Sequence, residues 1–244
     1  MNSKSKIVIA NIENLTSLWK TVGISFQSYF SESKFDYCFI ENSDWPNRLW
    51  FHQHVDQIDI SIIKEKILSI SSSIIIPYFD TSENDLYKKL ESEGFIKQFE
   101  QVGMSLKLDN PIRVENNLSL QLVSNKSEAI FWSELFEITF GYKIQHSIVL
   151  KTSKEINYYI AHSQNQAVGT AVSYKTNKVM GIHSVGIHPE MRRKGYAKQL
   201  MEQLINDAIK KRCNYMTLQA SDMGKSLYLN LGFNEDFVIK NYSL

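Results

Sequence analysis

The residues whose types and spacing are best suited to chemistry form a cationic turn, Arg192-Arg193-Lys194-Gly195-Tyr196-Ala197. Because Gly195 has no side chain, several backbone N–H groups of such a turn can point together at one anion. The helical segment that follows adds the positive end of its dipole, and four side chains add full charges: Arg192, Arg193, Lys194 and Lys198. This combination predicts a diphosphate site. The alternative is an ordinary glycine turn with solvated basic side chains.

The elements that position the turn follow from the spacing of apolar residues. Residues 179–187 read as a strand, which His188-Pro189 ends. A helix is predicted over 195–212 because its apolar residues recur at intervals of three and four, as on one buried face: Ala197, Leu200, Met201, Leu204, Ile205, Ala208 and Ile209. The turn therefore joins a strand to a helix, a context in which backbone N–H groups bind phosphates.

The rest of the chain reads as alternating strands and helices. In the second half we expect strands at 118–123, 156–162, 167–174, 215–220 and 235–242 and helices at 127–140 and 223–231. In the first half we expect strands near 6–10 and at 37–41, 48–53 and 74–79, helices over 14–30, 59–70 and 82–92, and a strand-like run at 102–108. This order predicts an α/β fold in which each half has a mixed central β-sheet flanked by helices.

Two halves of similar design are separated by a polar stretch, residues 109–117, that contains a proline. Each half ends with a helix, a Gly-Phe pair and a strand, at Gly94-Phe95 and at Gly232-Phe233. We interpret this as a degenerate internal duplication, with domains at 1–110 and 111–244. The alternative is two unrelated helix ends, because glycine is common just after a helix.

Two motifs of the second half resemble those of the Gcn5-related N-acetyltransferase (GNAT) superfamily. The run from His188 to Ala197 matches the coenzyme A signature HPxxRxxGxG/A, and the run from Leu227 to Phe233 matches the late LYxxLGF helix. The resemblance extends from about Leu118 to Leu244. It implies two tandem acetyltransferase-like domains, of which the second moves an acetyl group from acetyl-CoA to a primary amine of a small-molecule or peptide acceptor and releases coenzyme A.

The resemblance also assigns roles to individual residues. Main-chain groups of the fourth strand of the fold, here Val185, Gly186 and Ile187, would hold the pantetheine arm. The pyrophosphate loop maps to Arg192, Arg193, Lys194, Gly195, Tyr196, Ala197 and Lys198. Ser221 stands where many relatives have an asparagine, and its hydroxyl can still hydrogen-bond the cofactor. Tyr228 would protonate the departing thiolate, because a phenol is neutral near pH 7; the alternative is a half-buried helix aromatic.

The general base is less clearly marked. Many relatives carry a glutamate on the fourth strand, whereas this chain has His183 and Ser184 there. An imidazole at His183 can accept a proton at neutral pH. Two alternatives remain open: His183 is a core histidine satisfied by its neighbours, or the amine arrives already deprotonated and no dedicated base exists.

The first half departs from the family pattern at the corresponding places. Residues 53–57 contain neither a glycine nor a cation, and Leu90 takes the place that Tyr228 holds relative to its Gly-Phe pair. We therefore expect the first half to shape the acceptor site and to pack against the second, without binding pyrophosphate. The cluster from Trp45 to Trp50 either faces the cleft or belongs to the core.

Composition excludes several other classes. A net charge of +1 over 244 residues gives no electrostatic footprint for nucleic acid or for an anionic membrane surface. Two cysteines are too few for a disulfide framework and no metal-ligand spacing is present, so we expect reduced thiols and no metal. No apolar run approaches the ~18 residues of a membrane span, and the first residues read as a strand, so we expect a cytoplasmic protein. The aromatic content leaves room for a homodimer.

Two other functions remain open at this stage. The first is a non-catalytic acyl-CoA-binding regulatory protein, which the missing carboxylate on the fourth strand favours. The second is an aminoacyl- or peptidyl-transferase built from paired acetyltransferase-like domains. The intact pyrophosphate loop and the lack of an extended basic surface for tRNA argue against the second.

Overall fold

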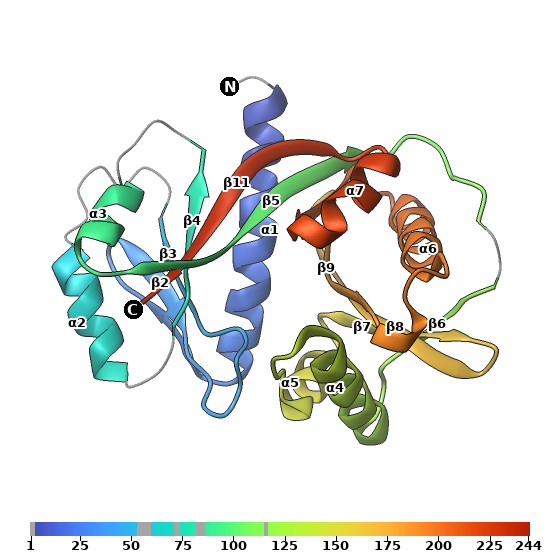
Figure 1. Cartoon of the computed structure of the whole chain (residues 1–244), viewed down its shortest axis with the longest axis horizontal. Helices are drawn as coiled ribbons and strands as arrows, with labels where there is room; N and C mark the ends of the chain where they lie inside the picture. Colours follow the sequence, from blue (N-terminus) through green and yellow to red (C-terminus); the bar gives the residue numbers. More distant parts are fainter. Residues whose placement is uncertain (1–2, 53–59, 71–73, 82–85, 115–116) are drawn as a thin grey trace.

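The computed structural model describes residues 3–52, 60–70, 74–81, 86–114 and 117–244. Within these ranges the strands form two sheets, one of eight strands in the order β4-β11-β5-β10-β9-β8-β7-β6 and one of three in the order β1-β2-β3 (Figure 1). The large sheet is mixed, because β9 and β10 run parallel and its other neighbours run antiparallel. The predicted α/β architecture of helices around a mixed sheet is confirmed.

The elements of the second half agree closely with those expected from the sequence. In chain order they are β6 (Ser119–Leu122), α4 (Lys126–Phe140), α5 (His146–Thr152), β7 (Asn157–Ser163), β8 (Gln166–Thr176), β9 (Val179–Ile187), the 3-10 turn η1 (Pro189–Met191), α6 (Tyr196–Lys210), β10 (Tyr215–Ala220), α7 (Asp222–Asn230) and β11 (Asn234–Ser243). Helix α5 was not predicted. It is a seven-residue helix that buries only Ile148, Val149 and Thr152, too short for a periodic signal.

The first half contains α1 (Ser3–Ser25), β1 (Tyr29–Ser31), β2 (Phe35–Cys38), β3 (Arg48–Phe51), α2 (Ile60–Ile70), β4 (Ile76–Asp80), α3 (Leu86–Ser92) and β5 (Ile96–Lys107). The predicted strand near 6–10 is wrong, because these residues belong to α1. The helix expected over 14–30 starts earlier and ends at Ser25, and Tyr29 and Phe30 lie in β1 instead. Residues 53–57, and the ends of the expected helices at 59 and 82–85, lie outside the described residues.

Packing explains why α1 overrides its local preference for a strand. The β-branched run Ile7-Val8-Ile9 favours β structure when taken alone. Further along, the residues buried from α1 recur at helical spacing: Asn11, Ile12, Asn14, Leu15, Leu18, Trp19 and Val22. This face packs on β5, β8, β9 and β11, so α1 covers strands that belong to both halves (Figure 1). None of the described helices is both long enough and apolar enough to cross a membrane.

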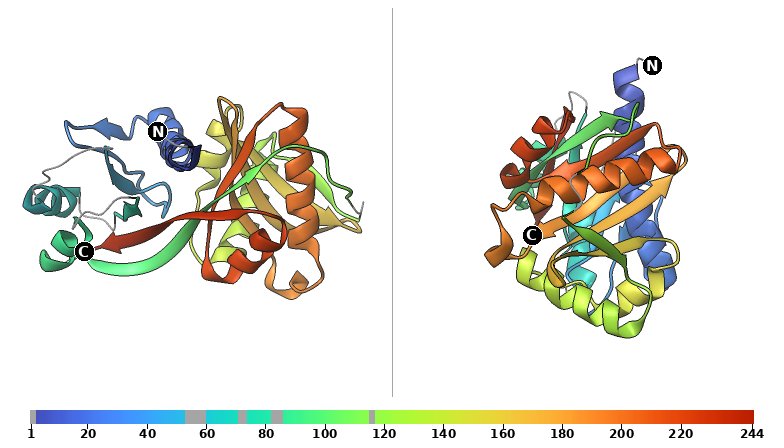
Figure 2. Two further views of the ribbon diagram at one scale, coloured as in Figure 1. Left: turned by 90° about the horizontal axis from the view of Figure 1, so that it is seen from above. Right: turned by 90° about the vertical axis from the view of Figure 1, so that its right-hand side faces the viewer.

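The last strand of each half pairs with a strand of the other half. Strand β5 of the first half pairs antiparallel with β10, with Met104 opposite Leu218, and β11 of the second half pairs antiparallel with β4, with Lys240 opposite Tyr78. Strands β5 and β11 also pair with each other. The large sheet therefore continues across residue 110, and β5 and β11 run side by side between the two parts of the molecule (Figure 2).

The pairing of β5 with β11 is symmetric about its centre. Gly103 lies nine residues after Gly94 and pairs with Phe237, which lies five residues after Gly232. The residues at the same offsets in the other half, Asn241 and Phe99, also pair with each other. The two irregularities in the ladder are equivalent too, because the residues that the strand register skips, Gln98 and Asp236, each lie four positions after their glycine. The two strands are thus related by an approximate two-fold axis.

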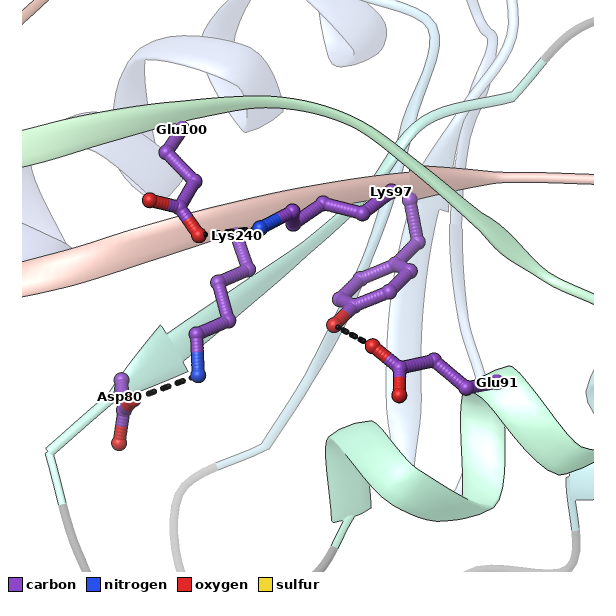
Figure 3. A network of polar contacts seen from close by, with 6 residues as sticks. Asp80, Glu91, Lys97, Glu100 and Lys240 are labelled. Atoms are coloured by element: carbon purple, nitrogen blue, oxygen red, sulfur yellow. Dashed lines mark hydrogen bonds and ion pairs between the residues drawn. The ribbon is translucent and has the colours of Figure 1, made fainter.

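Polar contacts attach the end of β11 to the first half. Lys240 Nζ lies 3.0 Å from Asp80 Oδ2 on β4, and Lys97 pairs with Glu100 at 2.7 Å beside it (Figure 3). The Tyr242 hydroxyl donates to Glu91 Oε1 on α3 at 2.9 Å. Burial, with further contributions from this bond and from the carboxylates nearby, raises the pKa of Tyr242. Strand β11 is therefore held by side chains as well as by the ladder.

Candidate active site

An opening lies between the two parallel strands of the large sheet. Strands β9 and β10 pair only from Val179 with Tyr215 to Gly181 with Thr217. Beyond this point β9 continues along β8, whereas β10 continues along β5, so their ends diverge. Parallel strands that separate expose main-chain groups that would otherwise lie in a ladder. An extended ligand can use such groups as hydrogen-bond partners.

Strand β9 bulges at this opening. Gly186 pairs with Thr170 and His183 with Val172, so Ser184 and Val185 together face a single residue of β8. Ser184 has a φ of 53°, in the left-handed region that side chains rarely adopt. A bulge of this kind bends a strand and redirects its main chain. The three residues predicted to hold the pantetheine arm thus lie at the bulge, with Val185 in it and Gly186 and Ile187 directly after it.

Gly186 is required by close packing of helix α4 against the bulged strand. A Cβ at this position would overlap Thr139 and the ring of Phe140, both at the end of α4. The Arg192 side chain fastens the same junction, because Nε donates to the carbonyl of Ile187 at 3.1 Å and Nη2 to that of Thr139 at 3.3 Å. The side chain of Arg192 is therefore engaged with backbone, and its predicted contact with a cofactor stays a prediction.

The cationic turn adopts the geometry expected for an anion site. Gly195 has a φ of 78° and precedes α6 as its N-cap, and Arg193 has a φ of 62°. Among the residues the structure describes, no side chain caps this helix, so its first N–H groups lack intrahelical acceptors. The side chains of Arg193, Lys194 and Lys198 are exposed around the turn. Lys198 lies 3.7 Å from Glu202, a weak surface pair that leaves its charge accessible.

Tyr228 of α7 is buried, and its ring packs edge-on against Phe233 with centroids 5.8 Å apart. Gly224, one turn earlier, makes room for it, because a Cβ there would lie 3.1 Å from the Tyr228 ring. Burial raises the pKa of Tyr228 to about 12, so the phenol is protonated at neutral pH. Its hydroxyl has no hydrogen-bond partner in the described part of the chain.

Ser221 occupies the N-cap position of α7 without capping it. Its backbone is extended, with φ of −72° and ψ of 163°, but its hydroxyl makes no cap bond to the described helix. The side chain is exposed at the mouth of the opening. The predicted hydrogen bond from Ser221 to a cofactor is therefore sterically available.

His183 lies in the opening, and both of its ring nitrogens face amide oxygens. Nδ1 is 3.0 Å from Gln219 Oε1 on β10, and Nε2 is 3.3 Å from Asn14 Oδ1 on α1. Gln219 continues the chain of contacts to Asn11 at 2.7 Å. Burial lowers the pKa of His183 to about 4, partly offset by the bond to Gln219. The imidazole is therefore neutral and weakly basic near pH 7, so it can donate to only one of the two amide oxygens. Its burial and this hydrogen bond favour the alternative of a core histidine.

Sequence reasoning missed the three amides around His183. Asn11 and Asn14 are fully buried on α1, where they also donate to the carbonyls of Met104 and Tyr174. The available signal was two asparagines three positions apart within an apolar stretch, since buried amides need specific partners. Gly181 allows the approach of α1, because a Cβ there would overlap Asn14 Oδ1.

A cavity of about 1730 Å³ joins these features. One side is formed by the opening, with His183, Val185, Ser221 and Tyr228 in its lining. The other side comes from the first half, including Leu15 and Trp19 of α1, residues 39–45 and Arg48. The cluster from Trp45 to Trp50 divides: Trp45, Asn47 and Arg48 line the cavity, whereas Leu49 and Trp50 are buried in the core.

The structure therefore brings four predicted residues to one cavity and leaves the rest beside it. Gly186 and Ile187 lie on β9 next to its wall, and the turn at 192–198 follows directly after that strand, outside the cavity lining. This arrangement can hold a long ligand by its anionic end at α6 while its other end reaches the cavity. Tyr228 would then offer a protonated hydroxyl to the reacting end.

Comparisons with known proteins agree with this arrangement. Residues 126–233 match the model of the acetyltransferase (GNAT) family. A GCN5-related N-acetyltransferase from Kribbella flavida superposes with a TM-score of 0.72 at 12% identity, over 100% of this chain and 96% of that one. A GCN5-related N-acetyltransferase from Sphaerobacter thermophilus superposes with a TM-score of 0.62 at 14% identity, over 81% of this chain and 72% of that one. A tandem GNAT protein from the clavulanic acid biosynthesis pathway superposes with a TM-score of 0.61 at 10% identity, over 86% of this chain and 78% of that one.

At these identities the superpositions show a shared fold and nothing more. A search of curated protein sequences found no match. The match of residues 126–233 is independent of the superpositions and covers β9, the cationic turn and α7. The second half is therefore similar in sequence to the acetyltransferase (GNAT) family over residues 126–233, and the chain shares the fold of the superposed structures.

Proposed function

We propose that this chain transfers an acetyl group from acetyl-CoA to a primary amine, with residues 126–233 as its catalytic part. The observation that carries the proposal is the opening between β9 and β10. It has an uncapped helix N-terminus beside one end and the unpaired hydroxyl of Tyr228 in its wall. When bound, acetyl-CoA would supply an activated acyl thioester.

The residues of the cationic turn fit the diphosphate of such a ligand. A Cβ added at Gly195 would have only Gln199 at 4.0 Å nearby, so the surface above the turn is open. The N–H groups at the start of α6 would bind phosphate oxygens, and Arg193, Lys194 and Lys198 would add charge. Main-chain groups of Val185, Gly186 and Ile187 would orient the pantetheine arm, and an N–H such as that of Ile187 would polarise the thioester carbonyl.

Tyr228 would act on the departing sulfur. Because the pKa of Tyr228 is raised to about 12 by burial, its hydroxyl keeps its proton until the reaction needs it. A protonated phenol can donate to the sulfur as negative charge develops there. Since the hydroxyl makes no bond within the described chain, it is free to do so.

A dedicated general base is not part of this proposal. His183 remains a candidate, but burial lowers its pKa to about 4, which makes it a poor proton acceptor at neutral pH. Direct attack by an amine that has lost its proton to water requires positioning alone. The same observation favours a second candidate, a regulatory protein that binds acyl-CoA without turnover.

We also propose that the chain is a duplication of one acetyltransferase-like unit, with units at 1–110 and 111–244 that have exchanged their last strands. The two-fold pairing of β5 with β11 supports this interpretation, because unrelated strands have no reason to share offsets and bulges. Leu90 is fully buried where the second unit has Tyr228. The first unit would then lack the hydroxyl and serve to close the acceptor side of the cavity.

The proposal is tested by measuring coenzyme A release and binding side by side. Purified protein is mixed with acetyl-CoA and a panel of primary amines, and free thiol is followed with a chromogenic disulfide. We expect micromolar binding of coenzyme A by calorimetry and amine-dependent thiol release. Binding without release for any amine would favour the regulatory alternative, and absence of binding would reject both functions.

A further inference from the structure

We propose that the acceptor amine carries a carboxylate and that Arg48 binds this carboxylate. The inference rests on the proposed acetyl transfer and names the class of acceptor: an amino carboxylic acid. It is built on a side chain from the first half of the chain, in the cluster whose place the sequence left open.

Arg48 lies at the start of β3 and lines the cavity. Its Nη1 donates to the carbonyl of Asn47 at 2.9 Å and, more weakly, to that of Asp44 at 3.5 Å. Its Nε and Nη2 make no hydrogen bond within the described ranges, and no described carboxylate lies within ion-pair distance. One edge of the guanidinium is thus held by backbone while the other donors remain available to a ligand.

A cation in this position needs a partner. Burial lowers the pKa of Arg48, with partial compensation from Tyr142 and Asp44. Arginine nevertheless keeps its charge in proteins. A partly buried charge without a counter-ion costs folding free energy. The guanidinium is planar and matches a carboxylate with two parallel hydrogen bonds, so a carboxylate ligand would relieve that cost.

Arg48 is linked to the bulged strand by a row of aromatic side chains. Tyr142 lies near Arg48 and packs edge-on against Phe136 and Phe140, with centroids 4.9 and 6.1 Å apart. The Phe140 ring in turn lies against Gly186 of β9. Arg48, Tyr142, Phe140 and Val185 all line the same cavity. A ligand that fills this wall would have its anionic end at Arg48 and its other end toward the bulge.

The remaining charges of the cavity select a zwitterion. Among the described lining residues, Lys225 pairs with Glu235 at 3.5 Å, and Glu100 pairs with Lys97 at 2.7 Å. The described carboxylates of the lining that have no ion-pair partner are Glu41, Asp44 and Asp222. They would attract an ammonium group and repel a dianionic phosphate. One arginine among these carboxylates therefore favours a single carboxylate together with an amine.

The binding test uses product analogues and does not depend on turnover. N-acetyl amino acids and their matched carboxamides are titrated by calorimetry into the protein loaded with coenzyme A. We expect at least one acid to bind and its amide to bind about 10- to 100-fold more weakly, the size of a charge-assisted hydrogen-bonded pair. Arg48→Gln should lower affinity for the acid by the same factor and leave the amide unchanged, and Arg48→Lys should restore part of the loss.

Arg113→Gln is the matched control, because Arg113 is exposed and outside the cavity lining. It should bind the acids as the wild type does. The thermal unfolding midpoint of Arg48→Gln should equal or exceed that of the wild type, since an uncompensated charge is removed. If no acid binds, if amides bind as well as acids, or if Arg48→Gln keeps its affinity for the acid, the inference is wrong.

A turnover test separates this inference from the proposed function. Coenzyme A release is compared for amino acids and for the amines formed by their decarboxylation. Equal rates for both classes would leave acetyl transfer standing and overturn the role of Arg48. Acid binding that depends on Arg48, without release of coenzyme A for any acceptor, would leave the role of Arg48 standing and overturn acetyl transfer.

Discussion

His183 Nε2 lies 3.3 Å from Asn14 Oδ1, so the bulged strand of the second half is joined to the first helix of the chain. Asn14 also donates to the carbonyl of Tyr174 at 3.0 Å and to the hydroxyl of Thr176 at 2.8 Å. The base of the opening between β9 and β10 is therefore closed by a helix from the other half. This contact makes the first half part of the site.

Gly181→Ala should destabilise the protein through this contact. The new Cβ would overlap Asn14 Oδ1, and overpacking of this kind costs about 2 kcal/mol. Asn14→Ala should also destabilise, by about 2 kcal/mol, because buried hydrogen bonds are lost. In the double variant the overlap with Asn14 is gone and that with His183 Nε2 remains. The double variant should therefore lose less free energy of unfolding than the sum of the two single losses. Urea unfolding of the four proteins measures this.

Gly141→Ala serves as the control for additivity. Gly141 has a φ of 76° but no atom near the position of a Cβ, so only its backbone conformation opposes alanine. Its effect should add to that of Asn14→Ala. Additive losses for Gly181→Ala as well would show that α1 does not approach β9 as closely as the structure indicates.

Stability should fall as pH is lowered, through His183. The pKa of His183 is about 4 in the folded protein, below its ordinary value of 6.5, so the unfolded chain binds more protons between these two pH values. Protonation therefore favours unfolding, and stability is full above about pH 6.5 and lost toward pH 4. Between pH 7.5 and pH 5.0 we expect a loss of about 2 kcal/mol from this group.

His183→Gln isolates this contribution. Glutamine can keep a hydrogen bond to its neighbours but does not titrate, so the loss between pH 7.5 and pH 5.0 should shrink by about 2 kcal/mol in urea unfolding. The rate of acetyl transfer at pH 7.5 should change little. An unchanged pH dependence of stability, or a rate profile that loses an ionisation near neutrality, would restore His183 as a general base.

The sequence predicted the second half well because its elements carry strong local signals. Helix α6 has a continuous buried face, and the two motifs of the second half predict the cationic turn and α7. The strand expected near 6–10 failed for the opposite reason, since Ile7, Val8 and Ile9 prefer β structure until α1 packs across the sheet. Local pattern also cannot reveal that β5 pairs with β10 and β11 with β4, because both would form strands with any partner.

The candidate site likewise contains residues whose roles the sequence predicted and residues whose roles depend on contacts between distant segments. Gly195 and Tyr228 belong to short motifs, so their roles could be inferred before their positions were known. Asn14 and Gln219 act only through contacts between segments far apart in the chain. Arg48 stood in a cluster that the sequence could assign to neither core nor cleft. Its place in the cavity depends on the relative position of the two halves.

Gly195→Glu should abolish binding of coenzyme A. A carboxylate would cover the N–H groups that start α6 and repel the diphosphate, so calorimetry should detect no binding at concentrations that saturate the wild type. Gly195→Ala is the matched control. It should keep most of the affinity, with a stability loss of about 1 kcal/mol from the φ of 78°. Unchanged affinity in the glutamate variant would place the diphosphate elsewhere.

Tyr228→Phe should lower kcat for acetyl transfer by about 100-fold or more, the contribution of a positioned general acid. The KM for acetyl-CoA should stay within about two-fold, because the hydroxyl acts on the sulfur during the reaction. The variant should be as stable as the wild type, since the hydroxyl has no hydrogen bond to lose among the described residues. Tyr242→Phe is the contrasting control: it loses the bond to Glu91, so it should be less stable while its kcat is retained. Steady-state kinetics with thermal unfolding distinguish the two, and an undiminished kcat for Tyr228→Phe would remove this hydroxyl from the mechanism.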